Sequence, residues 1–319
     1  MSLPVFAIQI ITHNSCSVIL PCLASLAAQD IAYDLILIDQ ASTDGTPDLL
    51  EANGLTPQRN TINTGYSAGH NQAIRLSHAP LVLTLNPDVV LQPGFLRAMQ
   101  EAFADSPLLG MANGCLLRIE TIDGVPYCID SLGVFMQHTR RQGLRGEGQP
   151  ISAVPTVITP IFGPDGAAAV YRRMMLEDIV LAGEMFDEDF FLQKEDIDLC
   201  WRGRWRGWEA VCVPHAVAHH IRHFRPGQRM QVAPWIKALA VRNRTWLMLK
   251  NAVPVWWEWP AILFYDAALL MYCLLFERSS LRGIWQAWQG RGRMLAKRRQ
   301  IMTGRRVSRY EMRIFLNMK

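Results

Sequence analysis

The first hundred residues alternate between apolar runs, polar loops and helix-like segments. Residues 5–11 are a largely apolar run with several β-branched side chains, which is typical of a strand buried on both faces of a parallel sheet. Residues 35–38 and 81–85 predict two further strands, and a segment with helical spacing or helix-capping residues follows each strand. These repeated units predict an α/β fold whose mostly parallel sheet is flanked by helices.

Polar loops follow the three predicted strands at what should be one edge of the sheet. They are residues 12–14, 39–45 and 86–88. Because open α/β sheets bind ligands outside the carboxyl ends of their strands, residues 1–110 are interpreted as a Rossmann-like nucleotide-binding half. Residues 111–225 would complete the same domain as an acceptor half.

An acidic segment, residues 186–198, places six carboxylates among aromatic side chains. Carboxylates crowded near apolar surface repel one another and lose solvation, so a cation or proton-transfer chemistry usually explains their presence. The alternative is an acidic helix start, which the helix dipole favours. From residue 195 the apolar residues form one helical stripe that predicts a core face, and Glu195 and Asp196 lie off this stripe, free to face a cleft.

The second part of the chain differs in composition from the first. Residues 278–319 contain twelve Lys or Arg and the single acid Glu311, a pattern that suits anionic lipid headgroups better than nucleic acid. Residues 253–276 are apolar but interrupted by Glu258 and Asp266, which favours an interfacial or re-entrant helix over a span, with a packed helix hairpin as the alternative. We therefore expect a helical, membrane-proximal basic extension over residues 226–319.

Cellular location and broad class follow from what the sequence lacks. The seven cysteines form no C-x-x-C pair and indicate reduced thiols. No basic segment precedes the first strand, so no secretory signal is expected. The prediction is a cytoplasmic protein associated with the inner face of the cell membrane, without a nucleic-acid partner.

Familiar nucleotide fingerprints are absent, since the chain contains neither a P-loop motif nor G-x-G-x-x-G after the first strand. Instead, Asp88 ends a predicted strand, and Glu195 with Asp196 follows about a hundred residues later. Such a pair suggests a hard divalent cation bridging a diphosphate, because Mg²⁺ takes one or two carboxylates together with phosphate oxygens.

Four motifs then stand in a fixed order along the chain: residues 39–46, 63–71, 85–88 and 186–199. Together they resemble a family 2 glycosyltransferase of GT-A fold, and within that family the rhamnosyltransferase-like enzymes of cell-surface polysaccharide assembly. The resemblance covers roughly residues 5–250.

The resemblance implies roles for individual residues. It makes Asp39 the acceptor of the pyrimidine N3–H of the donor, Asp88 the metal ligand at the last position of a D-x-D motif, and Asp196 the general base supported by Glu195. The first position of that motif is Asn86 here, so one anionic metal ligand is missing. The other implied nucleotide-sugar contacts are Thr12, Asn14, Ser42, Asn63, Gly65, Asn71 and Asn86.

Further implied contacts come from the acceptor half. Asp165 and Gly166 are expected on the acceptor side, and His220 beside the metal, with His219 equally available. Arg222 and Arg225 are candidates for phosphate binding.

The implied activity is inverting transfer of a sugar, rhamnose or a similar hexose, to a hydroxyl of a glycan or lipid-linked glycan. The donor would be a dTDP- or UDP-sugar and the cofactor Mg²⁺ or Mn²⁺. Two alternatives remain open: a polyprenyl-phosphate sugar transferase, suggested by residues 256–276, and an inactive membrane-surface scaffold, suggested by Asn86 and the basic tail. A glycoside hydrolase also uses paired carboxylates, but it would leave the nucleotide-side loops without a role.

Overall fold

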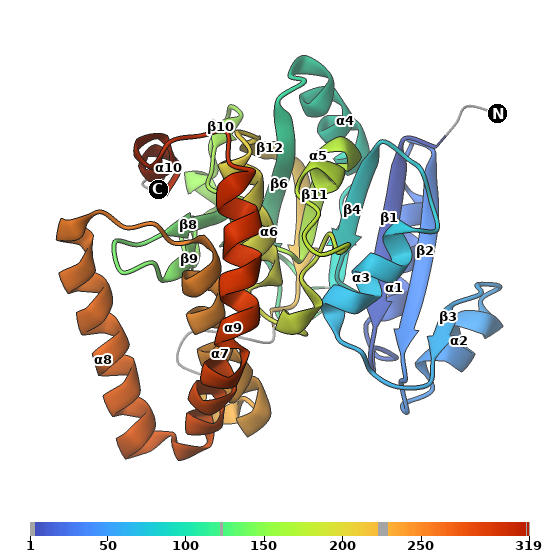
Figure 1. The fold of residues 1–319 in the computed structure, drawn as a ribbon. Helices are drawn as coiled ribbons and strands as arrows, with labels where there is room; N and C mark the ends of the chain where they lie inside the picture. Colours follow the sequence, from blue (N-terminus) through green and yellow to red (C-terminus); the bar gives the residue numbers. More distant parts are fainter. Residues whose placement is uncertain (1–3, 122–123, 223–228, 317, 319) are drawn as a thin grey trace.

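One ten-stranded sheet forms the centre of the molecule (Figure 1). The computed structural model describes residues 4–121, 124–222, 229–316 and 318. The strand order is β10-β12-β6-β11-β4-β1-β2-β3, with β5 paired to β12 and β7 to β6, and β8 and β9 form a separate small sheet. The strands are β1 (Phe6–Thr12), β2 (Tyr33–Gln40), β3 (Gln58–Asn60), β4 (Leu81–Leu85), β5 (Val89–Leu91), β6 (Leu109–Arg118), β7 (Cys128–Ser131), β8 (Val134–Met136), β9 (Gln142–Leu144), β10 (Thr159–Pro160), β11 (Ala168–Arg172) and β12 (Glu209–His220).

The half built from β3, β2, β1 and β4 is entirely parallel. Every residue of β1 is buried, as expected for a strand covered on both faces. The register places Thr12 opposite Asp39, so the ends of β1 and β2 bring their polar loops together. This arrangement confirms the predicted α/β class and the common edge of the loops.

The other half is a mixed sheet. Strand β11 runs antiparallel between β4 and β6, whereas β12 runs parallel to β6. Strand β5 then pairs antiparallel with the end of β12, opposite His219 and His220. This pairing brings the loop after β4 next to the end of β12, which lies more than a hundred residues away in sequence.

Helices cover both faces of the sheet (Figure 1). Apolar residues of α1 and α4 pack in one buried cluster, and those of α3, α5 and α6 pack in the other. The second cluster continues into α7, α9 and α10, so the C-terminal helices share a core with the sheet. The helices are α1 (Ile19–Ala27), α2 (Thr46–Ala52), α3 (Tyr66–Ile74), α4 (Phe95–Asp105), α5 (Arg173–Asp178), α6 (Glu195–Trp205), α7 (Pro234–Asn251), α8 (Trp259–Phe276), α9 (Leu281–Thr303) and α10 (Arg309–Leu316), with short 3₁₀ turns at Ile151–Ala153, Glu188–Phe190, Arg229–Gln231, Trp256–Glu258 and Arg278–Ser280.

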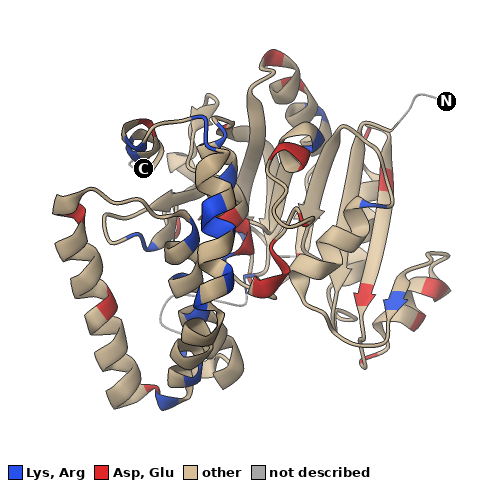
Figure 2. Ribbon diagram, viewed as in Figure 1, with Lys and Arg blue, Asp and Glu red and all other residues tan. Residues whose placement is uncertain are grey.

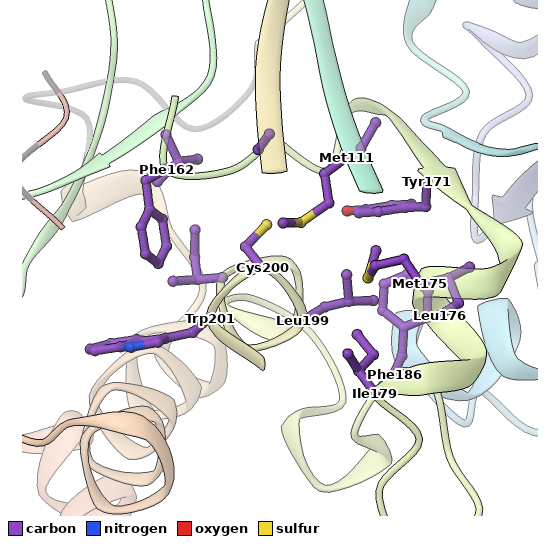
Figure 3. Close-up of a cluster of buried hydrophobic side chains, with 14 of the residues drawn as sticks. Met111, Phe162, Tyr171, Met175, Leu176, Ile179, Phe186, Leu199, Cys200 and Trp201 are labelled. Atoms are coloured by element: carbon purple, nitrogen blue, oxygen red, sulfur yellow. The ribbon is translucent and has the colours of Figure 1, made fainter. Parts of the chain in front are cut away.

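Helix α6 buries the tryptophan stripe that the sequence predicts as core. Trp201 and Trp205 are fully buried. Leu199, Cys200 and Trp201 of α6 lie against side chains from the sheet and from the segment before it (Figure 3). The core face of α6 therefore fixes the direction in which its first residues point.

Helix α8 stands apart from the body of the molecule (Figure 1). Its apolar residues are mostly exposed, and the segment Trp256–Phe276 is long and apolar enough to cross a membrane by length and composition. The expected interruptions do not break the helix, because Pro260 lies in its first turn, and Asp266 forms an ion pair with Arg244.

Buried ion pairs tie the acidic segment to the C-terminal helices. The ammonium of Lys250 on α7 is fully buried, contacts Asp187 and lies 2.8 Å from Asp198 Oδ1. Lys297 on α9 lies 2.6 Å from Asp187 Oδ1 and 2.8 Å from Asp189 Oδ2. Figure 2 shows this band of basic residues on α9 facing acidic residues of the body. The carboxylates of Asp187 and Asp189 are therefore paired with lysines of the C-terminal helices.

Replacing Lys250 by Ala should therefore destabilise the protein strongly. Two buried carboxylates would each lose one of the two cations that they contact, and breaking a buried ion pair costs about 3–5 kcal/mol. Urea denaturation followed by circular dichroism measures the free energy of unfolding. Arg299→Ala, at an exposed position of α9, is the control and should change this energy by less than about 0.5 kcal/mol. Equal small effects of both variants would contradict the importance of the buried pairs.

Candidate active site

The ends of β1 and β2 hold the carboxylate of Asp39 in a fixed position. Asp39 is 1% exposed. Its Oδ1 accepts hydrogen bonds from the Thr12 hydroxyl at 2.8 Å and the Ser42 hydroxyl at 2.5 Å, and its Oδ2 accepts from Ser42 N at 2.9 Å. Asn14 closes the loop, since its Oδ1 accepts from Thr43 N at 2.8 Å. The structure thus brings these four candidates together at the predicted sheet edge.

The candidates between residues 63 and 71 have structural partners. Asn63 Oδ1 accepts from Gly65 N at 2.8 Å. A Cβ on Gly65 would lie 2.6 Å from the carbonyl oxygen of Phe191, and its φ of 92° is unfavourable for other residues. Asn71 binds the backbone of Phe186 through both its Nδ2 and its Oδ1. These residues connect the nucleotide half to the acidic segment.

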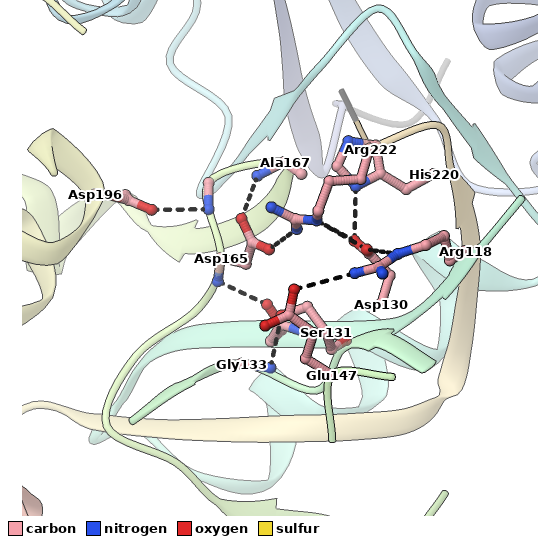
Figure 4. A network of polar contacts seen from close by, with 12 residues as sticks. Arg118, Asp130, Ser131, Gly133, Glu147, Asp165, Ala167, Asp196, His220 and Arg222 are labelled. Atoms are coloured by element: carbon pink, nitrogen blue, oxygen red, sulfur yellow. Dashed lines mark hydrogen bonds and ion pairs between the residues drawn. The ribbon is translucent and has the colours of Figure 1, made fainter. Parts of the chain in front are cut away.

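A polar network around Asp130 (Figure 4) reaches Asp88, which follows β4, through His220. His220 Nε2 lies 3.6 Å from Asp88 Oδ1, and His220 Nδ1 lies 2.8 Å from Asp130 Oδ2. Arg222 donates from Nε to both oxygens of Asp130, and its other end contacts Asp165. The expected pairing of Asp88 with His220 is therefore present. His219, on the opposite side of the strand, lies 3.4 Å from Gln92 Nε2 instead.

Asp130 is the centre of this network and was not recognised from the sequence. It is fully buried on β7, and Arg118 donates to it at 2.8 Å. Hydrogen bonds from His220 and Arg222 outweigh burial and hold the pKa of Asp130 below its usual range. The pKa of His220 rises to about 9 against the effect of burial, because Asp130 and Asp88 favour its charged form. A lone acid in the apolar stretch 128–132 was the only available signal.

The residues around Asp88 fit a divalent cation that is bound together with a diphosphate. In the part of the chain that the structure describes, no group of three or more His, Cys, Asp or Glu side chains could hold a metal ion alone. Asp88 can supply one ligand, and His220 a second when the cation displaces its Nε2 proton. The hydrogen bond that His220 Nδ1 donates to Asp130 fixes the ring so that Nε2 faces Asp88. Phosphate oxygens and water would complete the coordination, as Mg²⁺ prefers.

A pocket of about 660 Å³ opens beside this network. Five of the predicted site residues line it: Asn86, Asp165, Gly166, Glu195 and Asp196. Arg222, predicted only as a phosphate ligand, also lines it, and so do three residues that were not predicted: Tyr66, Arg141 and Lys194. The other predicted nucleotide and metal residues lie outside its lining. Arg225 lies outside the described residues.

Asp196 and Glu195 begin α6 at the wall of this pocket. Gly166 N donates to Asp196 Oδ2 at 3.2 Å, and Ile197 N donates to Asp196 Oδ1 at 2.8 Å. Burial and the charge of Asp165 raise the pKa of Asp196 to about 6. Burial and the charge of Asp196 raise the pKa of Glu195 to about 8. At neutral pH the pair therefore carries one negative charge, on Asp196, and Glu195 keeps its proton.

The loop before α6 is strained and is held by α7. Phe191, Gln193 and Lys194 have φ values of 65°, 70° and 71°, which cost energy in residues with a side chain. Asn243 Nδ2 lies 3.0, 2.9 and 2.7 Å from the carbonyl oxygens of residues 190, 192 and 193. A residue of the C-terminal helices thus positions the chain that leads into Glu195 and Asp196.

Replacing Asn243 by Leu, which has a similar size but no donor, should loosen this loop. Each lost hydrogen bond contributes about 1 kcal/mol, so hydrogen exchange of the amides at 191–197 should accelerate about tenfold or more. Mass spectrometry of exchanged peptides measures this rate. Thr245→Val on the same helix is the control, since that hydroxyl bonds only its own helix at Val241 O. Unchanged exchange at 191–197 would contradict the role of Asn243.

The chain is similar in sequence to known glycosyltransferases. Residues 7–116 match the family described as Glycosyl transferase family 2. The chain is 28% identical over 286 residues to an N-acetylglucosaminyl-diphospho-decaprenol L-rhamnosyltransferase of Mycobacterium tuberculosis, which covers 82% of this chain and 89% of that protein. It is 29% identical to the succinoglycan biosynthesis protein ExoU of Rhizobium meliloti over 43% of this chain and 44% of that protein.

Solved glycosyltransferases of GT-A type share the fold. The mannosyltransferase PcManGT from Pyrobaculum calidifontis, in complex with GDP-Man and Mn²⁺, superposes with a TM-score of 0.55 at 16% identity and covers 98% of this chain and 84% of that one. Residues 1–349 of TarS from S. aureus, in complex with UDP-GlcNAc, superpose with a TM-score of 0.54 at 16% identity, over 98% and 89% of the two chains. The chain therefore has a GT-A fold, its residues 7–116 match glycosyltransferase family 2, and most of its length resembles a rhamnosyltransferase in sequence.

Proposed function

We propose that this glycosyltransferase moves a sugar, rhamnose or a similar hexose, from a dTDP- or UDP-sugar to a hydroxyl of a lipid-linked glycan, with inversion at the anomeric carbon. The observation that carries the proposal is Asp196. It is the ionised member of a buried carboxyl pair and lies at the wall of the pocket. A base with a pKa just below neutral suits the removal of a hydroxyl proton as its oxygen attacks.

The donor would lie along the sheet edge between Asp39 and Asp88. Asp39, held by Thr12 and Ser42, would accept from the nucleobase. Asp88 and His220 would hold Mg²⁺ or Mn²⁺, which when bound supplies positive charge to the diphosphate as it leaves. Arg222 is held between Asp130 and Asp165, close to the proposed diphosphate site. Its positive charge would stabilise the diphosphate where Asn86, in place of an acid, weakens metal binding.

The transfer step follows from this arrangement. The oxygen of the acceptor hydroxyl forms a bond to the anomeric carbon while the bond from that carbon to the diphosphate oxygen breaks. The hydroxyl proton passes to Asp196, and the nucleoside diphosphate departs with the bonding electron pair. Attack from the side opposite the leaving group inverts the carbon. Glu195, still protonated, keeps a second negative charge away from Asp196.

The acceptor and the location are proposed from the relative and from the C-terminal helices. The mycobacterial relative is named as an L-rhamnosyltransferase for N-acetylglucosaminyl-diphospho-decaprenol, a lipid-linked substrate. Residues 226–319 would form a membrane-proximal extension to a catalytic domain of residues 1–225. Exposed apolar residues of α8 and the basic residues of α9 support association with the inner face of the cell membrane.

Substitution at the two acidic positions tests the chemistry. Asp196→Asn keeps the shape but cannot take a proton, so transfer should fall about 10²- to 10⁴-fold. Asp88→Ala should lower kcat/KM for the donor about a hundredfold and weaken the dependence on Mn²⁺. Asp105→Asn, at an exposed position on α4, is the control. Wild-type turnover in both site variants would refute the mechanism.

Product analysis and donor binding separate the alternatives. A glycan-extended lipid supports the proposal, whereas a glycosyl-phosphate lipid would identify a polyprenyl-phosphate sugar transferase. The bound donor should raise the Tm when UDP- or dTDP-sugars are added with Mn²⁺. No shift with any nucleotide sugar would favour the inactive scaffold.

The rate of transfer should depend on the ionisation of Asp196. Below pH 6 the rate should fall about tenfold per pH unit as the carboxylate gains a proton, and above that value it should level off. The unfolded chain releases this proton near pH 4, so the same group should lower the free energy of unfolding as pH rises through 4 to 6. Steady-state kinetics and urea denaturation between pH 4.5 and 8, with Asp196→Asn as reference, measure both trends. An acidic limb in the Asn variant would assign it to another group.

A further inference from the structure

A second cavity, of about 840 Å³, lies on the other side of the strained loop from the pocket. Its apolar wall includes Phe191, Trp235 and Leu239, and three arginines line it as well: Arg242, Arg278 and Arg282. None of the described side chains that line it is acidic. The cavity therefore combines apolar surface with three positive charges, which suits an anionic amphiphile.

Contacts to its neighbours fix one of these arginines in place. The Arg242 guanidinium lies 4.3 Å from the centre of the Trp246 ring and donates at 2.9 Å to the carbonyl oxygens of Asp189 and Phe190. Arg278 and Arg282 are exposed. Arg242 is therefore held in a fixed position in the wall of the groove, whereas the exposed side chains of Arg278 and Arg282 can move toward a ligand.

The groove and the catalytic pocket are lined by neighbouring residues of one loop. Phe191 lines the groove, and the next three residues, 192–194, line the pocket that contains Asp196. A ligand with a sugar at Asp196 and an anionic group a few atoms further along would pass over Phe191. It would then reach the arginines without crossing the body of the protein.

The groove also lies where α8 returns to the body of the molecule. Arg278 is in the turn that follows α8, and Arg282 is in the first turn of α9. The last residues of α8 before this turn, Leu275 and Phe276, are 62% and 73% exposed. Figure 2 shows basic residues at the junction and none on most of α8. An apolar helix followed directly by basic residues is the arrangement found where a protein meets a membrane interface.

We propose that this groove binds the diphosphate of the lipid-linked acceptor, and that its lipid chain leaves along the exposed face of α8. The three arginines pair with the phosphate oxygens, and Trp235 and Leu239 contact the first carbons of the lipid. The inference rests on the proposed function, because it assumes that the acceptor sugar occupies the pocket at Asp196. It adds a phosphate-recognition site separate from the donor diphosphate site at Asp88.

Two acceptors with the same sugar test the groove. One is a short polyprenyl diphosphate sugar, and the other is an alkyl glycoside without phosphate, both in neutral detergent micelles. Wild type should prefer the first acceptor in kcat/KM, and Arg278→Ala with Arg282→Ala should reduce that preference about tenfold or more, because two charged hydrogen-bond donors are lost. Replacement of both arginines by Lys should retain part of the preference, since the charge remains.

Controls distinguish this inference from related outcomes. Arg291→Ala with Arg299→Ala removes two exposed charges from α9 outside the groove and should leave the preference unchanged. Equal losses on both acceptors, or an unchanged preference in the groove variant, would overturn the groove while leaving the proposed function intact. Wild type that transfers to neither acceptor would overturn both. Loss of flotation with phosphatidylglycerol vesicles but an unchanged preference in micelles would assign the arginines to bulk lipid and overturn the proposal.

Discussion

The buried ammonium of Lys250 is the contact on which the rest of the site depends. It lies between Asp187 and Asp198 and joins α7 to the segment that carries the catalytic carboxylates. Asp187 and Asp198 of that segment are fully buried, and cations from α6, α7 and α9 offset the cost of burying their charges. Once these pairs form, Asn243 of α7 lies against the carbonyl groups of residues 190–193. The C-terminal helices are therefore a structural part of the candidate active site.

Ion pairing divides the acidic segment into two chemical groups. Asp187, Asp189 and Asp198 are neutralised by Lys or Arg, and their role is to hold the fold together. Glu195 and Asp196 form no ion pair in the described structure, and burial raises the pKa of each. The same residue types, a few positions apart, thus differ in function because only some of them face a cation.

The diphosphate side is organised by positive charge rather than by an additional acid. Asp130 accepts hydrogen bonds from His220 and Arg222 and so fixes both side chains. Arg222 also contacts Asp165, which lines the pocket. With Asn86 in place of an acid, one carboxylate and one imidazole face the position of the donor phosphates. A cation would bind there mainly together with its nucleotide, and Arg222 would share in neutralising it.

Local sequence patterns predicted the first strands and helices of the sheet and the helix that starts at Glu195. Apolar runs, capping residues and the tryptophan stripe of α6 are local patterns, and they correctly predicted the sheet edge where Thr12, Asp39 and Asp88 gather, and the cleft-facing Glu195 and Asp196. The hydrogen bonds and ion pairs that hold the side chains of the site became visible only in the tertiary structure. Asp130 lies 90 residues from His220, Asn243 lies at least 50 residues from the carbonyl groups that it binds, and Lys250 lies 52 residues from Asp198. Such pairings arise from packing between distant elements, and no spacing along the chain records them.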